Sequence, residues 1–139
     1  MLTLAKTFEF SASHRLFRPD WSPEKNLEIF GKCANINGHG HNYKLEVSVR
    51  GPISSETGMI LDARLLHSIV QNRVLADIDH KNLDRDVDWL SGQITSVETI
   101  IQGMWDRLAP IIQYEAPPAR LARLCLWETS RIFATREEI

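Results

Sequence analysis

Gly31-Lys-Cys-Ala-Asn-Ile-Asn-Gly-His-Gly-His-Asn-Tyr43 is the stretch of this 139-residue chain that predicts both a strand and a reactive site. Side chains two residues apart lie on the same face of a β-strand, so His39 and His41 are expected to project in one direction. The alternation continues on the histidine side with Tyr43, Leu45, Val47 and Val49. We therefore predict a strand that begins in a pocket and continues along a core.

A metal site is the first interpretation of the histidine pair. A catalytic zinc ion takes three protein ligands and keeps one position open, so the third ligand has to come from another element. The segment from Phe8 to Leu16 alternates in the same way and places His14 on its apolar face. A lone histidine there would more often be a buried residue satisfied by a backbone carbonyl. Beside the pair, His14 is the expected third ligand of a Zn²⁺ ion.

Length and charge limit the classes of protein to which such a site can belong. A chain of 139 residues predicts a single domain over residues 1–139. Its formal net charge of -2 gives no electrostatic footprint for nucleic acid or for an anionic membrane. The sequence contains no recognisable secretion signal or membrane span. We expect a cytoplasmic protein that binds neither nucleic acid nor membrane.

The two cysteines have different surroundings. A disulfide between Cys33 and Cys125 is not expected in a reducing compartment. Cys125 lies in the apolar run Leu124-Cys-Leu-Trp127 and is interpreted as a small core residue. Cys33 lies in a loop rich in Gly and Asn beside the histidines, where two roles remain open. It would either ligate the metal and close the site, or stand nearby as a thiolate base.

The predicted fold class is α+β, with the element order ββααββ. An Asp62 N-cap and apolar residues at helical spacing predict a first helix over Ala63–Leu75. The capping box Thr95-Ser-Val-Glu98 predicts the start of a second helix. The later strands are expected over Leu121–Trp127 and Ile132–Thr135. Short connections favour an antiparallel four-stranded sheet with both helices on one face, and association of subunits would cover its open edges.

Several carboxylates have alternative interpretations. The polar segment Ala76–Asp86 would ordinarily be solvated surface, but its adjacent Asp79 and His80 also suit general acid–base chemistry, with the carboxylate orienting the imidazole. Glu128 follows the apolar strand directly, so it is either exposed beyond the sheet or buried for a purpose. Glu98 serves either the helix cap or a substrate.

These motifs together resemble the 6-pyruvoyl-tetrahydropterin synthase family, which includes the 6-carboxy-tetrahydropterin synthases. The matching segments are Phe10-Ser-Ala-Ser-His-Arg-Leu16, Gly31 to Lys44, Gly58-Met-Ile60, Asp79-His-Lys-Asn-Leu-Asp84 and Glu128-Thr129. They occur in the family's order over essentially the whole chain. The resemblance implies the tunnelling fold, in which subunit sheets close into a barrel. It also implies a homohexamer of two trimers, with active sites between subunits.

The resemblance also implies individual roles. The implied residues are zinc ligands at His14, His39 and His41, a catalytic Cys33, a catalytic Asp79 and His80 pair from a neighbouring subunit, a pterin anchor at Glu128, and a pterin-pocket segment containing Ser96 and Glu98. In that segment the family commonly has Thr-x-Glu-Asn, whereas this chain has Ser96-Val-Glu-Thr99. The hydroxyl is kept and the amide is lost, so the pterin contacts are expected to differ in detail.

The activity implied by the resemblance is that of a zinc-dependent carbon–oxygen lyase. It converts 7,8-dihydroneopterin triphosphate to 6-pyruvoyl-tetrahydropterin, with loss of triphosphate, in tetrahydrobiopterin biosynthesis. The related 6-carboxy-tetrahydropterin synthase of 7-deazaguanine (queuosine) biosynthesis typically has three residues between the cysteine and the His-Gly-His element. This chain has five between Cys33 and His39, which favours the pyruvoyl product. The third alternative is a noncatalytic zinc- or pterin-binding module, which would have no use for the thiol and the Asp-His pair.

Overall fold

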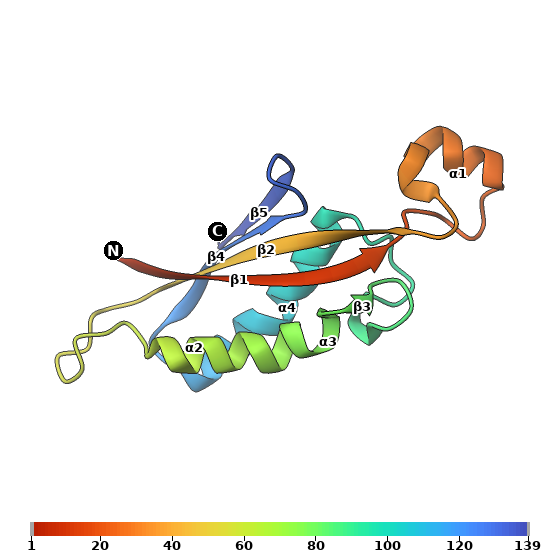
Figure 1. Cartoon of the computed structure of the whole chain (residues 1–139). Coiled ribbons are helices and arrows are strands. Elements are labelled where there is room, and N and C mark those ends of the chain that lie inside the picture. Colours follow the sequence, from red (N-terminus) through yellow and green to blue (C-terminus); the bar gives the residue numbers. More distant parts are fainter. Residues whose placement is uncertain (1, 139) are drawn as a thin grey trace.

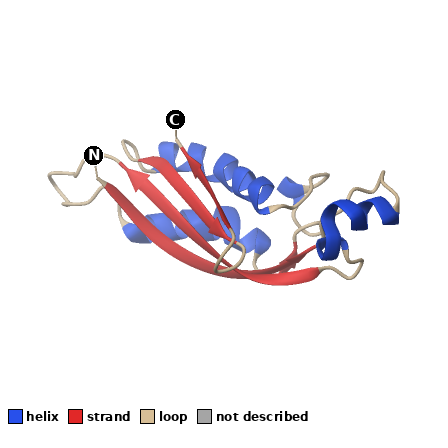
Figure 2. Ribbon diagram, turned by 90° about the horizontal axis from the view of Figure 1, so that it is seen from above, coloured by secondary structure: helices blue, strands red, loops and turns tan. Residues whose placement is uncertain are grey.

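The strands and helices form two layers (Figure 1) in a computed structural model that describes residues 2–138. The sheet contains β1 (Thr3–His14), β2 (His39–Arg50), β3 (Lys81–Asn82), β4 (Arg120–Trp127) and β5 (Phe133–Glu137). The helices are α1 (Pro23–Phe30), α2 (Ala63–Val70), α3 (Ala76–Ile78) and α4 (Val97–Glu115), with 3-10 turns at Gly31–Ala34 and Asp88–Leu90. Helices α2 and α4 lie on one face of the sheet, as predicted (Figure 2). Within residues 2–138, no helix is both long and apolar enough to cross a membrane.

The sheet has five strands in the order β3-β1-β2-β4-β5. β1, β2, β4 and β5 pair antiparallel, as the sequence predicted. The prediction of four strands was wrong because β3 adds a fifth, which pairs parallel with Ala12 and Ser13 of β1. A strand of two residues has no room for an alternating pattern, so the sequence of this polar segment does not reveal it. It holds the segment after His80 against the edge of β1.

The helix-covered face of the sheet carries the core. The predicted alternation in β1 and β2 is confirmed, since Phe8, Phe10, Tyr43 and Leu45 are all buried. β4 contributes Leu124 and Leu126, and the helices contribute Leu66, Ile69, Val70, Ile100, Met104, Leu108 and Ile112. Cys125 is buried as predicted, but it pairs with Glu46 and therefore shares the face that the helices do not cover. Both cysteines are free thiols.

The first long helix continues further than predicted. Its start is confirmed, because the Asp62 side chain accepts a hydrogen bond from the Arg64 N–H. The chain does not leave the helix at Leu75. It passes through a π-helical turn over Gln71–Leu75 and one more turn, α3, that ends at Ile78. Arg107 of α4 donates from Nε to the carbonyl of Arg73, which lies within the π-helical turn, at 2.6 Å. The extension delivers Asp79 and His80 to β1.

The second long helix begins one residue later than predicted. Ser96, and not Thr95, is the N-cap of α4, and its Oγ accepts the Thr99 N–H at 3.2 Å. Thr95 is fully buried and is used by a tertiary contact instead. A capping motif of two adjacent hydroxyl residues is ambiguous from sequence, since either can accept the first free N–H groups.

The cap assignment gives a stability prediction. Ser96→Ala should lower the free energy of unfolding by about 1 kcal/mol, the usual value of an N-cap hydroxyl. Ser96→Asp keeps an acceptor oxygen and is the matched control, which should unfold close to wild type. Denaturant unfolding at a fixed protein concentration measures both variants. Equal stability of Ser96→Ala and wild type would contradict the assignment.

Candidate active site

Three histidines from two adjacent strands converge at one end of the helix-covered face. The register of β1 and β2 places His14 directly opposite His39, and Ala12 opposite His41. The ring centroids of His14 and His39 are 4.6 Å apart, and those of His39 and His41 are 4.9 Å apart. One ligand atom from each of the three rings lies within 4.8 Å of the others. This cluster can bind a metal ion.

The donor atoms of the cluster suit a metal ligand role. His14 Nδ1 lies 2.7 Å from the carbonyl oxygen of Thr95, which requires that Nδ1 carry the proton and leaves a lone pair on Nε2. The Nε2 atoms of His14 and His41 are buried, and neither has a hydrogen-bond partner within residues 2–138. Burial lowers the pKa of both His14 and His41, which favours the neutral form that a metal binds.

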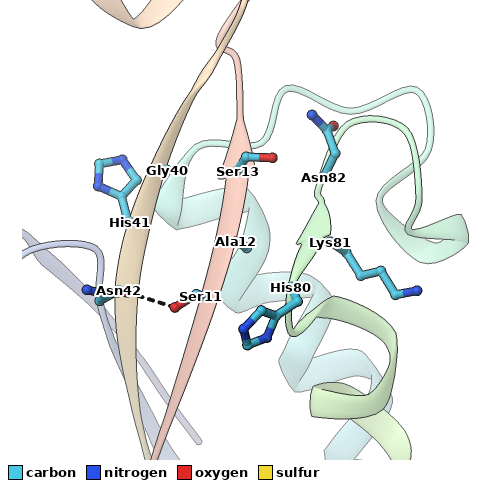
Figure 3. A pocket seen from close by; sticks show the side chains of 9 residues that line it. All are labelled: Ser11, Ala12, Ser13, Gly40, His41, Asn42, His80, Lys81 and Asn82. Carbon is cyan, nitrogen blue, oxygen red and sulfur yellow. Dashed lines mark hydrogen bonds between the residues drawn. The ribbon is translucent and has the colours of Figure 1, made fainter.

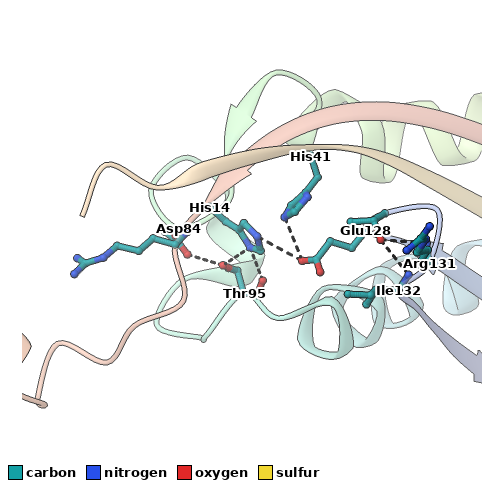
Figure 4. A network of polar contacts seen from close by, with 9 residues as sticks. His14, His41, Asp84, Thr95, Glu128, Arg131 and Ile132 are labelled. Atoms are coloured by element: carbon teal, nitrogen blue, oxygen red, sulfur yellow. Dashed lines mark hydrogen bonds and ion pairs between the residues drawn. The ribbon is translucent and has the colours of Figure 1, made fainter. Parts of the chain in front are cut away.

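A chain of hydrogen bonds continues outward from His14 (Figure 4). The Thr95 hydroxyl donates to Asp84 Oδ1 at 2.6 Å, and the backbone N–H of Arg15 donates to Asp84 Oδ2 at 2.7 Å. Sequence reasoning missed both Thr95 and Asp84. Thr95 was interpreted as a helix cap, and Asp84 was part of a quoted motif without a role. The only available signal was general, since a metal-bound histidine usually donates its second N–H to a carbonyl or carboxylate.

The loop before His39 packs closely against the end of β1. Gly38 has a left-handed backbone with φ 71°, and a Cβ there would lie 2.9 Å from the carbonyl oxygen of His14. Any other residue would therefore be strained and would push the loop away from His14. This close approach lets the loop before His39 turn into β2 so that His39 lies directly opposite His14.

Cys33 lies in the 3-10 turn Gly31–Ala34 and is partly exposed. The Leu16 N–H donates to the carbonyl of Cys33 at 2.8 Å, and Arg15 Nε donates to the carbonyl of Ala34 at 2.9 Å. These bonds hold the turn beside the end of β1. Among the described residues, the group of metal-ligating atoms within 4.8 Å contains the three histidines and does not include the Cys33 thiol.

Glu128 lies beside the histidine cluster. Its Oε1 is 3.5 Å from the Nε2 atoms of both His14 and His41 (Figure 4). This distance is longer than a normal hydrogen bond. The position is fixed by the turn after β4, in which the Glu128 N–H donates to the carbonyl of Ile132 at 2.9 Å. The sequence left open whether Glu128 is exposed beyond the sheet or buried. The side chain is 17% exposed, so most of it is buried.

Asp79 and His80 lie outside the histidine group, although His41 and His80 both line one pocket. Figure 3 shows His80 on the far side of β1 from His41, beside Ser11 and Lys81. This region is an open pocket of about 420 Å³. His80 Nδ1 lies 2.8 Å from Asp79 Oδ1, and the same oxygen accepts the Ser11 N–H at 3.1 Å. The His80 side chain is 81% exposed.

The two remaining predicted residues lie at the start of α4. Ser96 is partly buried, and its hydroxyl serves the cap and also lies 3.0 Å from the Thr99 hydroxyl. Glu98 is exposed in the first helical turn, where a carboxylate also interacts favourably with the helix dipole. The structure therefore gives each of them a local structural role.

Metal binding can be tested one imidazole at a time. His39→Ala should reduce Zn²⁺ binding from one ion per chain to a weak or undetectable level, because only two of the three required ligands remain. His67→Ala is the matched control, because His67 is an exposed histidine on α2 outside the cluster. Metal analysis after dialysis against dilute Zn²⁺ measures both variants. Full occupancy in His39→Ala would contradict the assigned ligand set.

Comparison with known proteins agrees with this geometry. A sequence model of the family described as 6-pyruvoyl tetrahydropterin synthase matches residues 3–138. The human 6-pyruvoyl tetrahydrobiopterin synthase is 38% identical over 126 residues, which cover 91% of this chain and 84% of the human protein. The solved structure of Caenorhabditis elegans 6-pyruvoyl tetrahydropterin synthase superposes with a TM-score of 0.88 at 33% identity, covering 99% of this chain and 96% of that one. A 6-carboxy-5,6,7,8-tetrahydropterin synthase of Haemophilus influenzae is 27% identical, covering 99% of this chain and 100% of that protein. This chain has the tunnelling fold that the resemblance implied, and it belongs to the 6-pyruvoyl tetrahydropterin synthase family.

Proposed function

We propose that this chain is a zinc-dependent lyase that converts 7,8-dihydroneopterin triphosphate to 6-pyruvoyl-tetrahydropterin and releases triphosphate. The observation that carries the proposal is the cluster of His14, His39 and His41 in a chain of this family. Two of its Nε2 atoms are buried and have no hydrogen-bond partner among the residues that the structure describes. The five residues between Cys33 and His39 favour the pyruvoyl product. So does the higher identity to relatives named for that product, 38% for the human protein against 27% for the carboxy-forming relative.

We assign the metal as Zn²⁺, since three neutral imidazoles form a typical catalytic zinc site. A zinc ion at this position would act as a Lewis acid toward the oxygens of the substrate side chain and make the adjacent C–H bond more acidic. His14, His39 and His41 hold the ion. The hydrogen bond from His14 Nδ1 to Thr95 keeps one of these rings in the orientation that binding requires.

Cys33 is the proposed base that removes the acidified proton. Its thiol lies on a turn fixed to β1 through the Leu16 N–H and outside the histidine group, which supports a role as a neighbour of the metal and not as a ligand. A cationic neighbour lowers the pKa of a thiol and increases the thiolate fraction near neutral pH. The proton is then taken up at Sγ.

Asp79 and His80 form the proposed second proton carrier. The Asp79 carboxylate fixes His80 Nδ1 at 2.8 Å, which leaves Nε2 to exchange a proton with the substrate. His80 has a left-handed backbone with φ 61°, a conformation that non-glycine residues seldom adopt and that occurs often at functional sites. The pair lies outside the histidine group of its own chain, and His80 lies across β1 from His41. This placement supports a homohexamer in which a neighbouring subunit supplies the pair.

Glu128 is the proposed anchor for the pterin ring. The 2-amino group and the adjacent ring N–H form a planar pair of donors that one carboxylate accepts in bidentate fashion. Its position 3.5 Å from two of the imidazoles would keep the bound ring next to the metal. Ser96 and Glu98 are retained as members of the pterin pocket, although Ser96 also caps α4. We propose that the whole chain is one catalytic domain of a cytosolic enzyme, where a catalytic thiol remains reduced.

Product analysis tests the proposal directly. Purified protein incubated with Zn²⁺ and 7,8-dihydroneopterin triphosphate should form 6-pyruvoyl-tetrahydropterin and free triphosphate, identified by mass spectrometry. The 6-carboxy product has a different mass and would support the carboxy-forming alternative. Unchanged substrate would contradict a lyase activity.

The role of Cys33 separates metal binding from turnover. Cys33→Ala should lower kcat by at least about 100-fold, because a general base contributes roughly that much or more. Its Zn²⁺ content should remain at the wild-type level, because the thiol is not a ligand. The matched control is Cys125→Ala, which removes a buried thiol from β4, away from the cluster. Loss of zinc from Cys33→Ala would show that the sulfur is a ligand.

Mixing two inactive variants tests the site between subunits. Cys33→Ala and His80→Ala, denatured together and refolded, should recover about one quarter of wild-type activity, because random neighbours in a symmetric oligomer rebuild that share of intact sites. Each variant refolded alone is the control and should remain inactive. If Cys33 and His80 of the same chain formed the site, mixing would restore nothing.

A further inference from the structure

The Asp84 carboxylate connects two parts of the site that are distant in sequence. One oxygen, Oδ1, accepts the Thr95 hydroxyl at 2.6 Å, and the other, Oδ2, accepts the Arg15 backbone N–H at 2.7 Å (Figure 4). Both distances are short, as is usual when the acceptor is ionised. Each carboxylate oxygen therefore holds a different segment, the loop before α4 and the end of β1.

The first connection leads to the histidine cluster. Thr95 is fully buried, and its carbonyl oxygen lies 2.7 Å from His14 Nδ1. A residue that orients an imidazole has to be fixed itself. The bond from the Thr95 hydroxyl to Asp84 fixes it, and the hydroxyl oxygen itself lies 3.3 Å from His14 Nδ1. Loss of the bond would therefore free the Thr95 side chain and loosen His14.

The second connection leads to the thiol. Arg15, whose N–H donates to Asp84, also donates from Nε to the carbonyl of Ala34 at 2.9 Å. The next N–H, that of Leu16, donates to the carbonyl of Cys33 at 2.8 Å. The turn that carries Cys33 thus rests on the two residues that follow β1, and Asp84 holds the first of them.

Asp84 is itself firmly placed. Its N–H donates to Asn82 Oδ1 at 3.0 Å, and the preceding Leu83 is fully buried and donates its N–H to the carbonyl of Ser13 at 2.8 Å. These contacts anchor the carboxylate to the same strand end that carries His14. The short strand β3 leads directly into this anchor, so β3 has a role in placing the site residues.

We propose that Asp84 is a positioning residue that sets the orientation of His14 and the placement of the Cys33 turn together. The His14 imidazole and the Cys33 thiol then keep a fixed spatial relation to one another. The inference rests on the proposed function for the meaning of that relation, but its two connections are properties of the folded chain alone. Asp84 acts through Thr95 and Arg15, and not on the substrate.

The test uses the full chain with Zn²⁺ as the probe. The dissociation constant for Zn²⁺, measured by competition with a chelator, should rise 10- to 100-fold in Asp84→Ala and in Thr95→Val, as is typical when a partner of a metal-bound histidine is removed. Thr95→Ser keeps the hydroxyl and should bind Zn²⁺ as wild type does. Asp86→Ala is the control for the loop, because the Asp86 carboxylate is exposed and accepts the Asn82 backbone N–H, so it makes neither of the two connections of Asp84.

Hydrogen exchange reports the second connection. The backbone N–H groups of Arg15 and Leu16 should exchange faster in Asp84→Ala, and at the wild-type rate in Thr95→Val, because the two substitutions break different bonds. With substrate, Asp84→Ala should lower kcat while KM changes little, since the pterin anchor is intact. A residue with a merely structural role would change the unfolding midpoint and leave Zn²⁺ affinity and local exchange unaltered.

Several outcomes would overturn the inference. Wild-type Zn²⁺ affinity in Thr95→Val would remove the first connection, and unchanged exchange at Arg15 and Leu16 in Asp84→Ala would remove the second. If Asp84→Ala does not fold, Asp84→Asn replaces it. Asp84→Asn keeps the size of the side chain but has only one acceptor oxygen. Wild-type values of both Zn²⁺ affinity and amide hydrogen exchange in this variant would refute the positioning role of Asp84. Zinc binding and exchange need no turnover, so an inactive wild-type protein would contradict the proposed function without deciding the role of Asp84.

Discussion

A hydrogen bond between a buried imidazole and a backbone carbonyl organises this site. His14 is fully buried, and its Nδ1 lies 2.7 Å from the Thr95 carbonyl. That contact satisfies one ring nitrogen and defines the tautomer, so the other nitrogen is left with a free lone pair in a buried position. Burying a polar atom without a partner is costly, and a protein keeps such an atom when a ligand completes it. A divalent ion is a ligand that fits these two nitrogens together with the neighbouring His39 ring.

The antiparallel pairing of β1 and β2 brings the remaining ligands to this point. A shift of the register by one residue would move His39 and His41 to the opposite face, away from His14. The same alternation that buries Tyr43 and Leu45 against the helices therefore also places His39 and His41 beside His14. The other face of β1 and β2 is polar, and the Asp79 and His80 pair lies at its edge. The three histidines and the Asp79 and His80 pair thus lie on opposite sides of β1, which is the observation behind the proposal that a neighbouring subunit supplies the pair.

Elements with a repeating pattern were predictable from sequence, and those determined by tertiary contacts were not. The alternation in β1 and β2 identified the sheet, its buried face and the three histidines that cluster. The helical spacing after Asp62 identified α2, but no local signal indicated the π-helical turn that carries the chain on to Asp79. β3 is too short to show a pattern. Thr95 had the right chemistry for a cap, yet its hydroxyl is bound by Asp84, and only the folded chain brings those two residues together.

In the proposed site, three imidazole nitrogens hold the metal, and the Cys33 sulfur is a neighbour and not a ligand. X-ray absorption at the zinc edge of the purified, zinc-loaded protein measures this coordination shell directly. We expect a shell of nitrogen and oxygen donors at about 2.0–2.1 Å with an imidazole scattering pattern that corresponds to three histidines. A sulfur donor at about 2.3 Å, or fewer than three imidazoles, would contradict it.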